Sequence, residues 1–448
     1  MARSKTQAST LALLGGEKAV TSGPGDLFTW PIVTREHEQA VLDVIRNRKM
    51  SQWGITQQFE KEYAETLGRK YALACNNGTA AIHCALFGLG VGVGDEVIAP
   101  SLTYWATCLQ VYSLGATVVF AEVDPNTLCI DPADIERRIT RRTKAIIPVH
   151  YSAMPADMDP IMRIARKHRL KVMEDCSHAH GTLYKGRQVG TFGHAAGFLL
   201  MTSKAFAIGE GGILFTDDRR VYERAILFGH YERHDQVQLP DLKPYAGIPC
   251  GGYKYRMHQA TSAFGRVSLK LYPKQMAEID RAMNRFCDLL EGVPGLHPIR
   301  PAKGSGSTRG GWYNVGARYA PEELGGLSVQ RFAEAVRAEG SVASPGCNRP
   351  LHPHPVFNGM DIYGHGRPTR LAHLPKGVDI RQPAGSLPIT EGINQRVIGL
   401  PWFKHDRPGI IRQHAAAFRK VAEHYAELLP GDCHVAETGA YTASFRKR

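Results

Sequence analysis

The sequence lacks long apolar runs, internal repeats and low-complexity blocks. No apolar stretch approaches the roughly 20 residues that span a bilayer, so we expect no transmembrane helix and no membrane partner. The apolar patch at residues 11–14 is also shorter than the roughly 7–15 residues of a signal-peptide core. We therefore expect a surface arm at residues 1–30 and a cytoplasmic protein.

Cysteine is sparse and has no recognisable spacing. Nine cysteines are scattered over 448 residues without a CxxC pair. An odd number without a disulfide framework fits a reducing compartment, in which buried thiols stay free.

Acidic residues are outnumbered by basic ones, which gives a formal net charge of +13. Basic stretches occur at residues 137–144, 166–171 and 446–448. A nucleic-acid-binding face needs such residues gathered together with interleaved aromatics. The first two stretches instead lie on helices or turns that lead into strands, so we expect solvated faces and no nucleic-acid partner. The excess charge favours anionic cofactors or substrates.

The remaining composition, 43% hydrophobic and 22% charged, is typical of a globular enzyme. Apolar strands alternate with helical segments between residues 71 and 218. We expect strands at 97–100, 117–124, 144–150, 171–175, 196–201 and 212–218, and helices at 80–90, 104–115 and 158–169. This alternation predicts an α/β layer with a mostly parallel sheet, covered on both faces. Ligands bind such sheets at the carboxyl ends of the strands.

The second half of the chain mixes strand and helix signals. A long helical stretch begins near residue 271, a flexible loop is expected at 301–311, and amphipathic helices are expected at 327–340 and 410–429. We interpret residues 31–290 as a large domain, 291–430 as a smaller C-terminal α+β domain, and 431–448 as a tail.

Chemically capable residues fall at strand ends and helix starts. "NNGTAAI" (76–82) places Gly78 and Thr79 at a helix start, where free N–H groups and a hydroxyl suit a phosphate. Thr79 could equally be a helix cap and nothing more. "SLTYWAT" (101–107) places Tyr104 and Trp105 after a strand, either to pack in the core or to stack on a planar ring.

"KVMEDCSHAHG" (171–181) ends a strand with Glu174, Asp175, His178 and His180. A carboxylate at this strand end faces a ligand site. The two histidines could instead bind a metal with a third ligand from residues 351–355. Their spacing is generic, and hydrogen-bonded loop histidines are the simpler interpretation, so we expect no metal.

"GFLLMTSKAFAIGEGG" (197–212) sets Lys204 between an apolar run and a glycine-rich turn. A lysine of this kind is ordinarily at the surface. A phosphate site, a carboxylate, a stacking aromatic and a lysine at the strand ends of one sheet together match the needs of pyridoxal phosphate (PLP), whose aldehyde forms a Schiff base with an amine. The carboxylate would keep the pyridine nitrogen protonated.

The order and wording of five segments resemble the DegT/DnrJ/StrS aminotransferases, which are fold-type I PLP enzymes of sugar and aminocyclitol biosynthesis. These are "NNGTAAI", "APSLTYWATCLQVYSLGATVVFAEVD", "MEDCSHAHGTLYKGRQVGTFG", "TSKAFAIGEGGILFTDD" and "YKYRMHQATSAFG". The resemblance runs from about residue 31 to 429. It implies a large PLP-binding domain with a seven-stranded, mostly parallel sheet between helices.

The resemblance also implies roles. Lys204 matches the Schiff-base lysine, which also shuttles a proton between cofactor and substrate. Asp175 matches the partner of the pyridinium, and Tyr104 the ring-stacking aromatic. His178 stands where many members have a glutamine that contacts the ring hydroxyl. Gly78 and Thr79 match the phosphate loop.

Two positions depart from the family pattern. Leu199 stands where many members have a phosphate-binding serine, for which Ser203 or Thr202 could compensate. Lys254 replaces the asparagine that reaches the phosphate of the neighbouring subunit, where its charge would strengthen the contact. The resemblance therefore implies an obligate homodimer in which Lys254 completes the partner's site.

The "KYR" form and the segment 344–357 resemble the branch that aminates scyllo-inosose-type cyclitol ketones or makes 3-amino-5-hydroxybenzoate, and Trp53 is a further candidate on the substrate side. The resemblance implies a transaminase that moves an amino group from glutamine or glutamate to a cyclitol ketone or nucleotide-linked keto sugar, in antibiotic-type secondary metabolism. The alternatives are a sugar dehydratase, which Lys204 argues against, a 3-amino-5-hydroxybenzoate synthase, and a catalytically silent PLP-binding subunit, which Leu199 keeps open.

Overall fold

The computed structural model describes residues 10–51 and 53–432. Its largest layer is a seven-stranded sheet with the order β1-β9-β8-β5-β4-β2-β3. These strands are β1 (Tyr71–Cys75), β2 (Glu96–Pro100), β3 (Thr117–Ala121), β4 (Thr143–Ile146), β5 (Lys171–Asp175), β8 (Ala195–Leu199) and β9 (Gly212–Thr216). Only β9 runs antiparallel to its neighbours β1 and β8. The predicted α/β layer with a mostly parallel sheet is confirmed.

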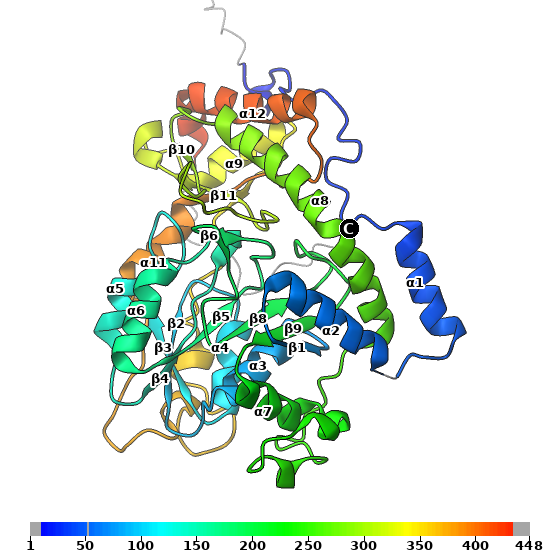
Figure 1. The fold of residues 1–448 in the computed structure, drawn as a ribbon. Helices are drawn as coiled ribbons and strands as arrows, with labels where there is room; N and C mark the ends of the chain where they lie inside the picture. The colour runs from blue at the N-terminus through cyan, green and yellow to red at the C-terminus, as the bar shows by residue number, and fades with distance from the viewer. Residues whose placement is uncertain (1–9, 52, 433–448) are drawn as a thin grey trace, which may run out of the picture.

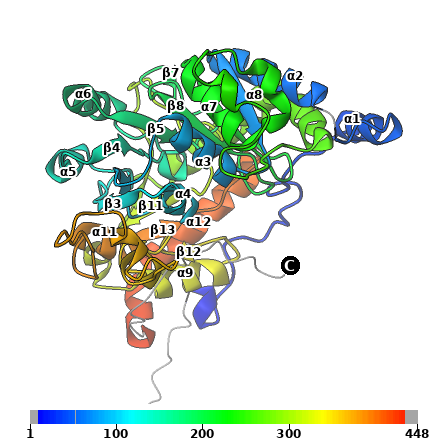
Figure 2. The same ribbon diagram turned by 90° about the horizontal axis from the view of Figure 1, so that it is seen from below.

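Helices pack around this sheet (Figures 1 and 2). They are α2 (Gly54–Leu67), α3 (Gly78–Gly88), α4 (Ala106–Ser113), α5 (Pro132–Arg138), α6 (Met158–His168) and α7 (Arg219–Gly229). Since β2 and β9 are buried along their whole length, these strands carry apolar side chains on both faces. A short hairpin, β6 (Leu183–Tyr184) and β7 (Arg187–Gln188), lies between β5 and β8 in the chain.

A second, antiparallel sheet forms from the C-terminal part of the chain, with the order β10-β11-β13-β12. Its strands are β10 (Leu296–Pro298), β11 (Gly316–Tyr319), β12 (Ser344–Pro345) and β13 (Val397–Gly399). Helices α9 (Val329–Ala338) and α12 (Pro408–Glu423) share a separate apolar core with this sheet. The short helices α10 (Pro355–Asn358) and α11 (Pro388–Gly392) belong to the long connection between β12 and β13.

The long helix α8 (Gln259–Leu289) runs from the large layer to the second sheet (Figure 1). We expected this helix to begin near residue 271, which is wrong. His258 caps its start by accepting from the backbone N–H of Ala260 (3.1 Å), and the helix continues through Pro273. Its N-terminal half packs against α1 (Arg35–Arg46) and α2.

The N-terminal segment, expected to be a surface arm, anchors two of its side chains in the C-terminal core. Leu11 and Leu27 are fully buried in the C-terminal core. The backbone N–H groups of Ala12 and Ala19 both donate to the carboxylate of Glu339 (2.8 and 2.9 Å). Residues 10–30 therefore cover an apolar face that would otherwise meet water. Residues 1–9 lie outside the described part of the chain.

The loop at 301–311 is anchored to its surroundings, contrary to the flexible loop expected there. The Thr308 N–H donates to the carbonyl of Leu183 (3.0 Å). Arg309 is buried and donates to the carbonyls of Ile299 (2.6 Å) and Ser152. The loop is thereby tied to both the large layer and the second sheet.

The described residues can be compared with the expectations for the basic stretches, the cysteines and membrane-spanning helices. Arg138 pairs with Asp134 (2.6 Å) and Arg142 with Glu96 (2.5 Å), so the stretch at 137–144 is neutralised in part by its own chain. The stretch at 446–448 lies outside the described residues. Six of the eight described cysteines are buried free thiols. Among the described helices, none is both long and apolar enough to cross a membrane.

Candidate active site

The carboxyl end of β5 carries two neighbouring carboxylates that point in opposite directions, because side chains alternate along a strand. Glu174 accepts hydrogen bonds from the N–H groups of Gly190, Phe192 and Gly193 (2.6–2.8 Å). These bonds fix the loop before β8, so Glu174 has a structural role. Asp175 is left to serve the opposite side of the strand.

Asp175 is buried and held by two donors. The hydroxyl of Thr107 in α4 donates to Oδ2 (2.7 Å), and the N–H of Ser177 donates to Oδ1 (3.0 Å). Thr107 also contacts the hydroxyl of Thr103 (2.9 Å). The carboxylate therefore has a fixed orientation, and Tyr104, in the turn before α4, lies at the same edge of the sheet as Asp175.

His178 is a neutral imidazole with a defined tautomer. Its Nδ1 accepts from the backbone N–H of Ser152 (3.2 Å), so the ring proton resides on Nε2. Burial, and then the positive charge of Lys204, holds the pKa of His178 well below its usual value. Nε2–H is thus available as a hydrogen-bond donor. Ser152 itself has a left-handed backbone (φ 53°), a strained conformation of the kind that gathers at functional sites.

Lys204 is buried, with 5% of its surface exposed. Its Nζ lies 4.0 Å from the centre of the Tyr313 ring, and the ring of His178 lies 4.6 Å from the same tyrosine. The backbone carbonyl of Lys204 accepts from the indole N–H of Trp30 (2.8 Å). Within the described residues Lys204 forms no salt bridge. The surface interpretation of Lys204 is therefore wrong, and a buried amine without a carboxylate partner lies beside His178.

The N-terminus of α3 offers unpaired donors. Asn77 is the N-cap, accepting from the N–H of Ala80 (2.8 Å), so Thr79 is not the cap. The N–H groups of Gly78 and Thr79 find no acceptor in the described part of the chain. Leu199 packs directly on this turn, since a Cβ at Gly78 would lie 2.7 Å from the Leu199 Cβ. Glycine is required at position 78 because Leu199 occupies that space.

Two predicted cofactor residues are not brought to this cluster by any described contact. Ser203 is exposed and lines a cavity together with Trp30. Lys254 is exposed and makes no described ion pair. Its segment lies beside the end of β1, where the N–H of Asn76 donates to the carbonyl of Tyr255 (2.7 Å). Trp53 is 39% exposed and precedes α2.

The metal alternative gains no support from the histidines that suggested it. His180 is fully buried and saturated, accepting from the Tyr63 hydroxyl (3.1 Å) and donating to the Leu199 carbonyl (2.8 Å). Among the described residues, two groups of three side chains have possible ligand atoms within 4.8 Å of one another, and neither contains His178 or His180. These groups are Cys75, Cys84 and His230, and His150, Glu174 and Cys176.

Sequence reasoning missed Thr107, Ser152 and Tyr313. Thr107 lies inside a quoted motif, one helical turn after Thr103, and that spacing was a usable signal. Tyr313 follows an irregular loop and precedes β11, away from the carboxyl ends of the large sheet, so the sequence offered no signal for it. The segment 344–357 contacts a neighbour of His178. The hydroxyl of Tyr151 donates to the amide oxygen of Asn348 (2.6 Å), and the ring of Tyr151 lies 5.5 Å from the ring of His178.

These residues fit PLP on the observations above. Lys204 supplies a buried amine without a salt bridge, which can react with the aldehyde. The oriented carboxylate of Asp175 is a partner for the ring nitrogen, and the neutral imidazole of His178 is a donor for the ring hydroxyl. The unpaired N–H groups at the start of α3 are donors for the phosphate.

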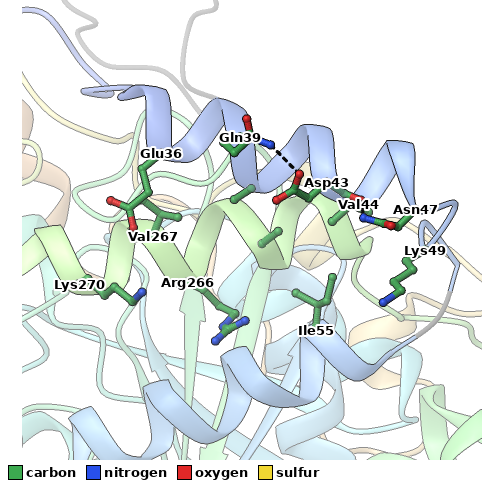
Figure 3. A pocket seen from close by; sticks show the side chains of 12 residues that line it. Glu36, Gln39, Asp43, Val44, Asn47, Lys49, Ile55, Arg266, Val267 and Lys270 are labelled. Atoms are coloured by element: carbon green, nitrogen blue, oxygen red, sulfur yellow. Dashed lines mark hydrogen bonds between the residues drawn. The ribbon is translucent and has the colours of Figure 1, made fainter.

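The pocket between α1, α2 and α8 has no such set of residues. Seven of its twelve lining residues are polar or charged, among them Glu36, Asp43 and Arg266 (Figure 3).

Comparison with known proteins agrees with this chemistry. A sequence profile described as the DegT/DnrJ/EryC1/StrS aminotransferase family matches residues 31–398. The chain is 32% identical over 365 residues to the spore coat polysaccharide biosynthesis protein SpsC of Bacillus subtilis (strain 168), covering 81% of this chain and 91% of that protein. It is 40% identical over 229 residues to GDP-perosamine synthase of Caulobacter vibrioides, covering 51% of this chain and 60% of that protein.

The fold is similar to that of an aminotransferase from Psychrobacter cryohalolentis. The TM-score is 0.76 at 28% sequence identity, and the match covers 90% of this chain and all of the other. The expected fold-type I architecture is thereby confirmed.

Proposed function

Because this chain belongs to the DegT/DnrJ/EryC1/StrS aminotransferase family, whose enzymes depend on PLP, we propose that it transfers an amino group from glutamine or glutamate to a nucleotide-linked keto sugar. The observation that carries this proposal is the buried Lys204, which forms no described salt bridge and lies beside His178, together with Asp175 held in a fixed orientation at the carboxyl end of β5. The sugar-related names of the two curated relatives support a sugar substrate over other ketones.

The chain's own residues divide the work. PLP, when bound, would supply an electron sink for the carbon that gains or loses the amino group. Lys204 would hold the cofactor, and its amine would carry the proton at the reacting carbon. Asp175, fixed by Thr107, would keep a positive charge on the ring nitrogen. His178 would donate Nε2–H to the ring oxygen, and the N–H groups at the start of α3 would bind the phosphate.

The first test is the absorbance spectrum of the purified protein with added PLP, followed by L-glutamine or L-glutamate. We expect a visible band from lysine-bound PLP, its loss on addition of the donor, and no band in Lys204→Ala. Lys70→Ala, a change at an exposed lysine, is the matched control and should behave as wild type. A wild-type band that neither donor bleaches would contradict the transaminase assignment while leaving the cofactor site intact.

The Leu199 side chain is the reason to keep a silent PLP-binding subunit as an alternative. It packs on Gly78 and brings no hydroxyl to the position where many family members have a phosphate-binding serine, and weak cofactor retention would follow from that missing donor. Absence of any visible band in wild type at saturating PLP would favour this alternative.

We also propose a homodimer in which Lys254 reaches the partner's phosphate site. Two observations support it: Lys254 is exposed without a described ion pair, and apolar side chains are exposed on and around α1. These side chains are Val33, Leu42, Ile45, Met50 and Trp53. Exposed apolar side chains gathered on and around one helix suit burial against a second copy.

Mixing two inactive variants tests this arrangement. A heterodimer of Lys204→Ala and Lys254→Ala has one complete site if Lys254 acts on the partner, and none if it acts within its own chain. Recovery of activity on co-expression supports the proposal. No recovery, with mixed dimers confirmed by mass, would place Lys254 at the site of its own chain, near Asn76.

A neutral cyclitol ketone is the second candidate substrate, with a 3-amino-5-hydroxybenzoate synthase as its related reaction. It is favoured by the "KYR" segment and by the contact of Asn348 in the 344–357 segment with Tyr151. Assay of a cyclitol ketone beside nucleotide-linked keto sugars separates the two. Antibiotic-type metabolism stays a prediction from the sequence resemblance.

A further inference from the structure

Two cysteines and a histidine meet where β1, α3 and α7 pack against one another (Figure 1). Cys75 is the last residue of β1, Cys84 lies in α3, and His230 directly follows α7. All three residues are fully buried. Because Cys75 and His230 are 155 residues apart in the chain, only the fold brings them together.

The separations within this cluster suit a tetrahedral metal ion. The possible ligand atoms of the three side chains lie within 4.8 Å of one another, and Sγ of Cys75 lies 3.6 Å from Nε2 of His230. Zinc binds sulfur at about 2.3 Å and nitrogen at about 2.0–2.1 Å, so tetrahedral bond angles place two such ligand atoms about 3.6 Å apart. A thiol–imidazole hydrogen bond has the same length, but it would account for one thiol and not for Cys84.

The far side of the His230 ring faces a carboxylate. Oε1 of Glu232 lies 3.8 Å from Nδ1 of His230, on the other side of the ring from Nε2 and Cys75. This Nδ1 and both carboxylate oxygens of Glu232 are buried and form no hydrogen bond within the described residues. A histidine that binds a metal through one ring nitrogen almost always donates its other N–H, commonly to a carboxylate. Glu232 stands where that acceptor is needed.

The charges of such a set balance. Cys75 and Cys84 would bind as thiolates, each giving its proton to solvent as a zinc–sulfur bond forms, and no electron is transferred. Two thiolates neutralise the charge of Zn²⁺, and His230 binds as the neutral imidazole. A neutral set suits a fully buried place, where an unpaired charge would be costly. Thiolate ligands favour zinc over magnesium or calcium, and a water molecule would complete the four ligands.

The second group of possible ligands, His150, Glu174 and Cys176, differs because its polar atoms already have partners. His150 accepts from the N–H of Ala156 at Nδ1 (3.1 Å) and donates Nε2–H to Glu174 (3.1 Å). The Glu174 carboxylate also accepts three backbone N–H groups. A metal there would have to break these bonds, so this group serves as an internal control.

We propose that Cys75, Cys84 and His230 bind one zinc ion, with Glu232 as the acceptor that orients His230. The ion would join the end of β1 to α3 and α7. Cys75 lies two residues before Asn77, the N-cap of α3, so zinc would hold the connection that leads into this helix start. The inference does not depend on the proposed function, because bleaching of the PLP band by an amino donor needs no zinc.

The test is the zinc content of the untagged, PLP-loaded protein, produced with added zinc, desalted and measured by mass spectrometry of the elements. We expect about one zinc per chain in wild type and less than about a tenth of that in Cys84→Ser and His230→Gln, which each lack one ligand. Glu232→Gln keeps the three ligands and should weaken zinc binding about ten- to a hundredfold. Cys176→Ser, in the second group, and Cys250→Ser, at an exposed cysteine, are the controls and should keep the wild-type content.

Cobalt(II) in place of zinc gives a test that needs no variant, should the substitutions prevent folding. Cobalt bound by thiolates has a strong charge-transfer band in the near ultraviolet, recorded as a difference spectrum against the zinc form. We expect this band in wild type.

Four results would overturn the proposal. The first is wild type that retains neither zinc nor cobalt, and the second is cobalt bound without the thiolate band. The third is a zinc content that Cys84→Ser and His230→Gln leave unchanged. The fourth is a disulfide between Cys75 and Cys84 in protein purified without reductant, because its sulfurs could not bind zinc as thiolates.

Discussion

The substitution Leu199→Ser tests how the start of α3 receives a phosphate. The Leu199 side chain packs on Gly78, within 2.7 Å of where a Cβ would stand at that position, and the N–H groups of Gly78 and Thr79 have no described acceptor. A serine hydroxyl there would add one donor to the same turn. A hydrogen bond to a charged acceptor contributes about 1.5–3 kcal/mol, so PLP affinity should rise about ten- to a hundredfold.

The assay is the dissociation constant of PLP for the apoenzyme, measured by absorbance or quenching of intrinsic fluorescence. Leu199→Ala is the necessary control, because it removes the same bulk without adding a hydroxyl. Both variants lose part of the roughly 1.5–3 kcal/mol that a fully buried leucine contributes, and Leu199 is only partly buried. Equal PLP affinity in Leu199→Ser and Leu199→Ala would refute the reasoning, since the hydroxyl would then not reach the phosphate.

Three further predictions concern the fold. In Gly212→Ala the new Cβ would lie 2.2 Å from the carbonyl oxygen of the α3 N-cap residue. We therefore expect either no soluble protein or a free energy of unfolding, measured with urea, that is lower by at least about 3 kcal/mol. Gly392→Ala is the control and should be neutral, because there is open space around Gly392. Leu11→Ala should lower the free energy of unfolding by about 2–5 kcal/mol because Leu11 is fully buried. Leu14→Ala, at a residue that is 41% exposed, should lower it by less than about 1 kcal/mol. Equal effects of the two substitutions would contradict the burial of Leu11 in the C-terminal core. Burial lowers the pKa of His180 to about 4, so its neutral form is favoured in the fold and the unfolded chain binds the extra proton below about pH 6.5. Stability should therefore be complete above pH 6.5 and fall by up to about 1.4 kcal/mol per pH unit toward pH 4 on account of this residue, and a thermal-melt pH series on His180→Gln that keeps the full wild-type slope would argue against it.

Two residues show why the candidate site could be anticipated only in part. Asp175 and Lys204 were found because each ends or follows an apolar strand, and strand ends of a parallel sheet share one edge. Tyr313 contacts Lys204 across more than a hundred residues of sequence and follows an irregular loop, so no local pattern announced it. No local pattern pointed to Trp402 or Lys404 either, because the residues that line the cavity beside Ser203 with them come from three other parts of the chain.

The sequence by itself determined the alternation of apolar strands and amphipathic helices, and with it the parallel layer and the strand ends that carry Asp175, His178 and Lys204. Such periodicities follow from backbone geometry, which is local. Only the tertiary structure decided that Leu11 belongs to a core, that Ser203 faces a cavity, and that Lys404 is buried without a partner. Those outcomes depend on which distant surfaces pack together, and burial is a property of the packed chain rather than of any segment within it.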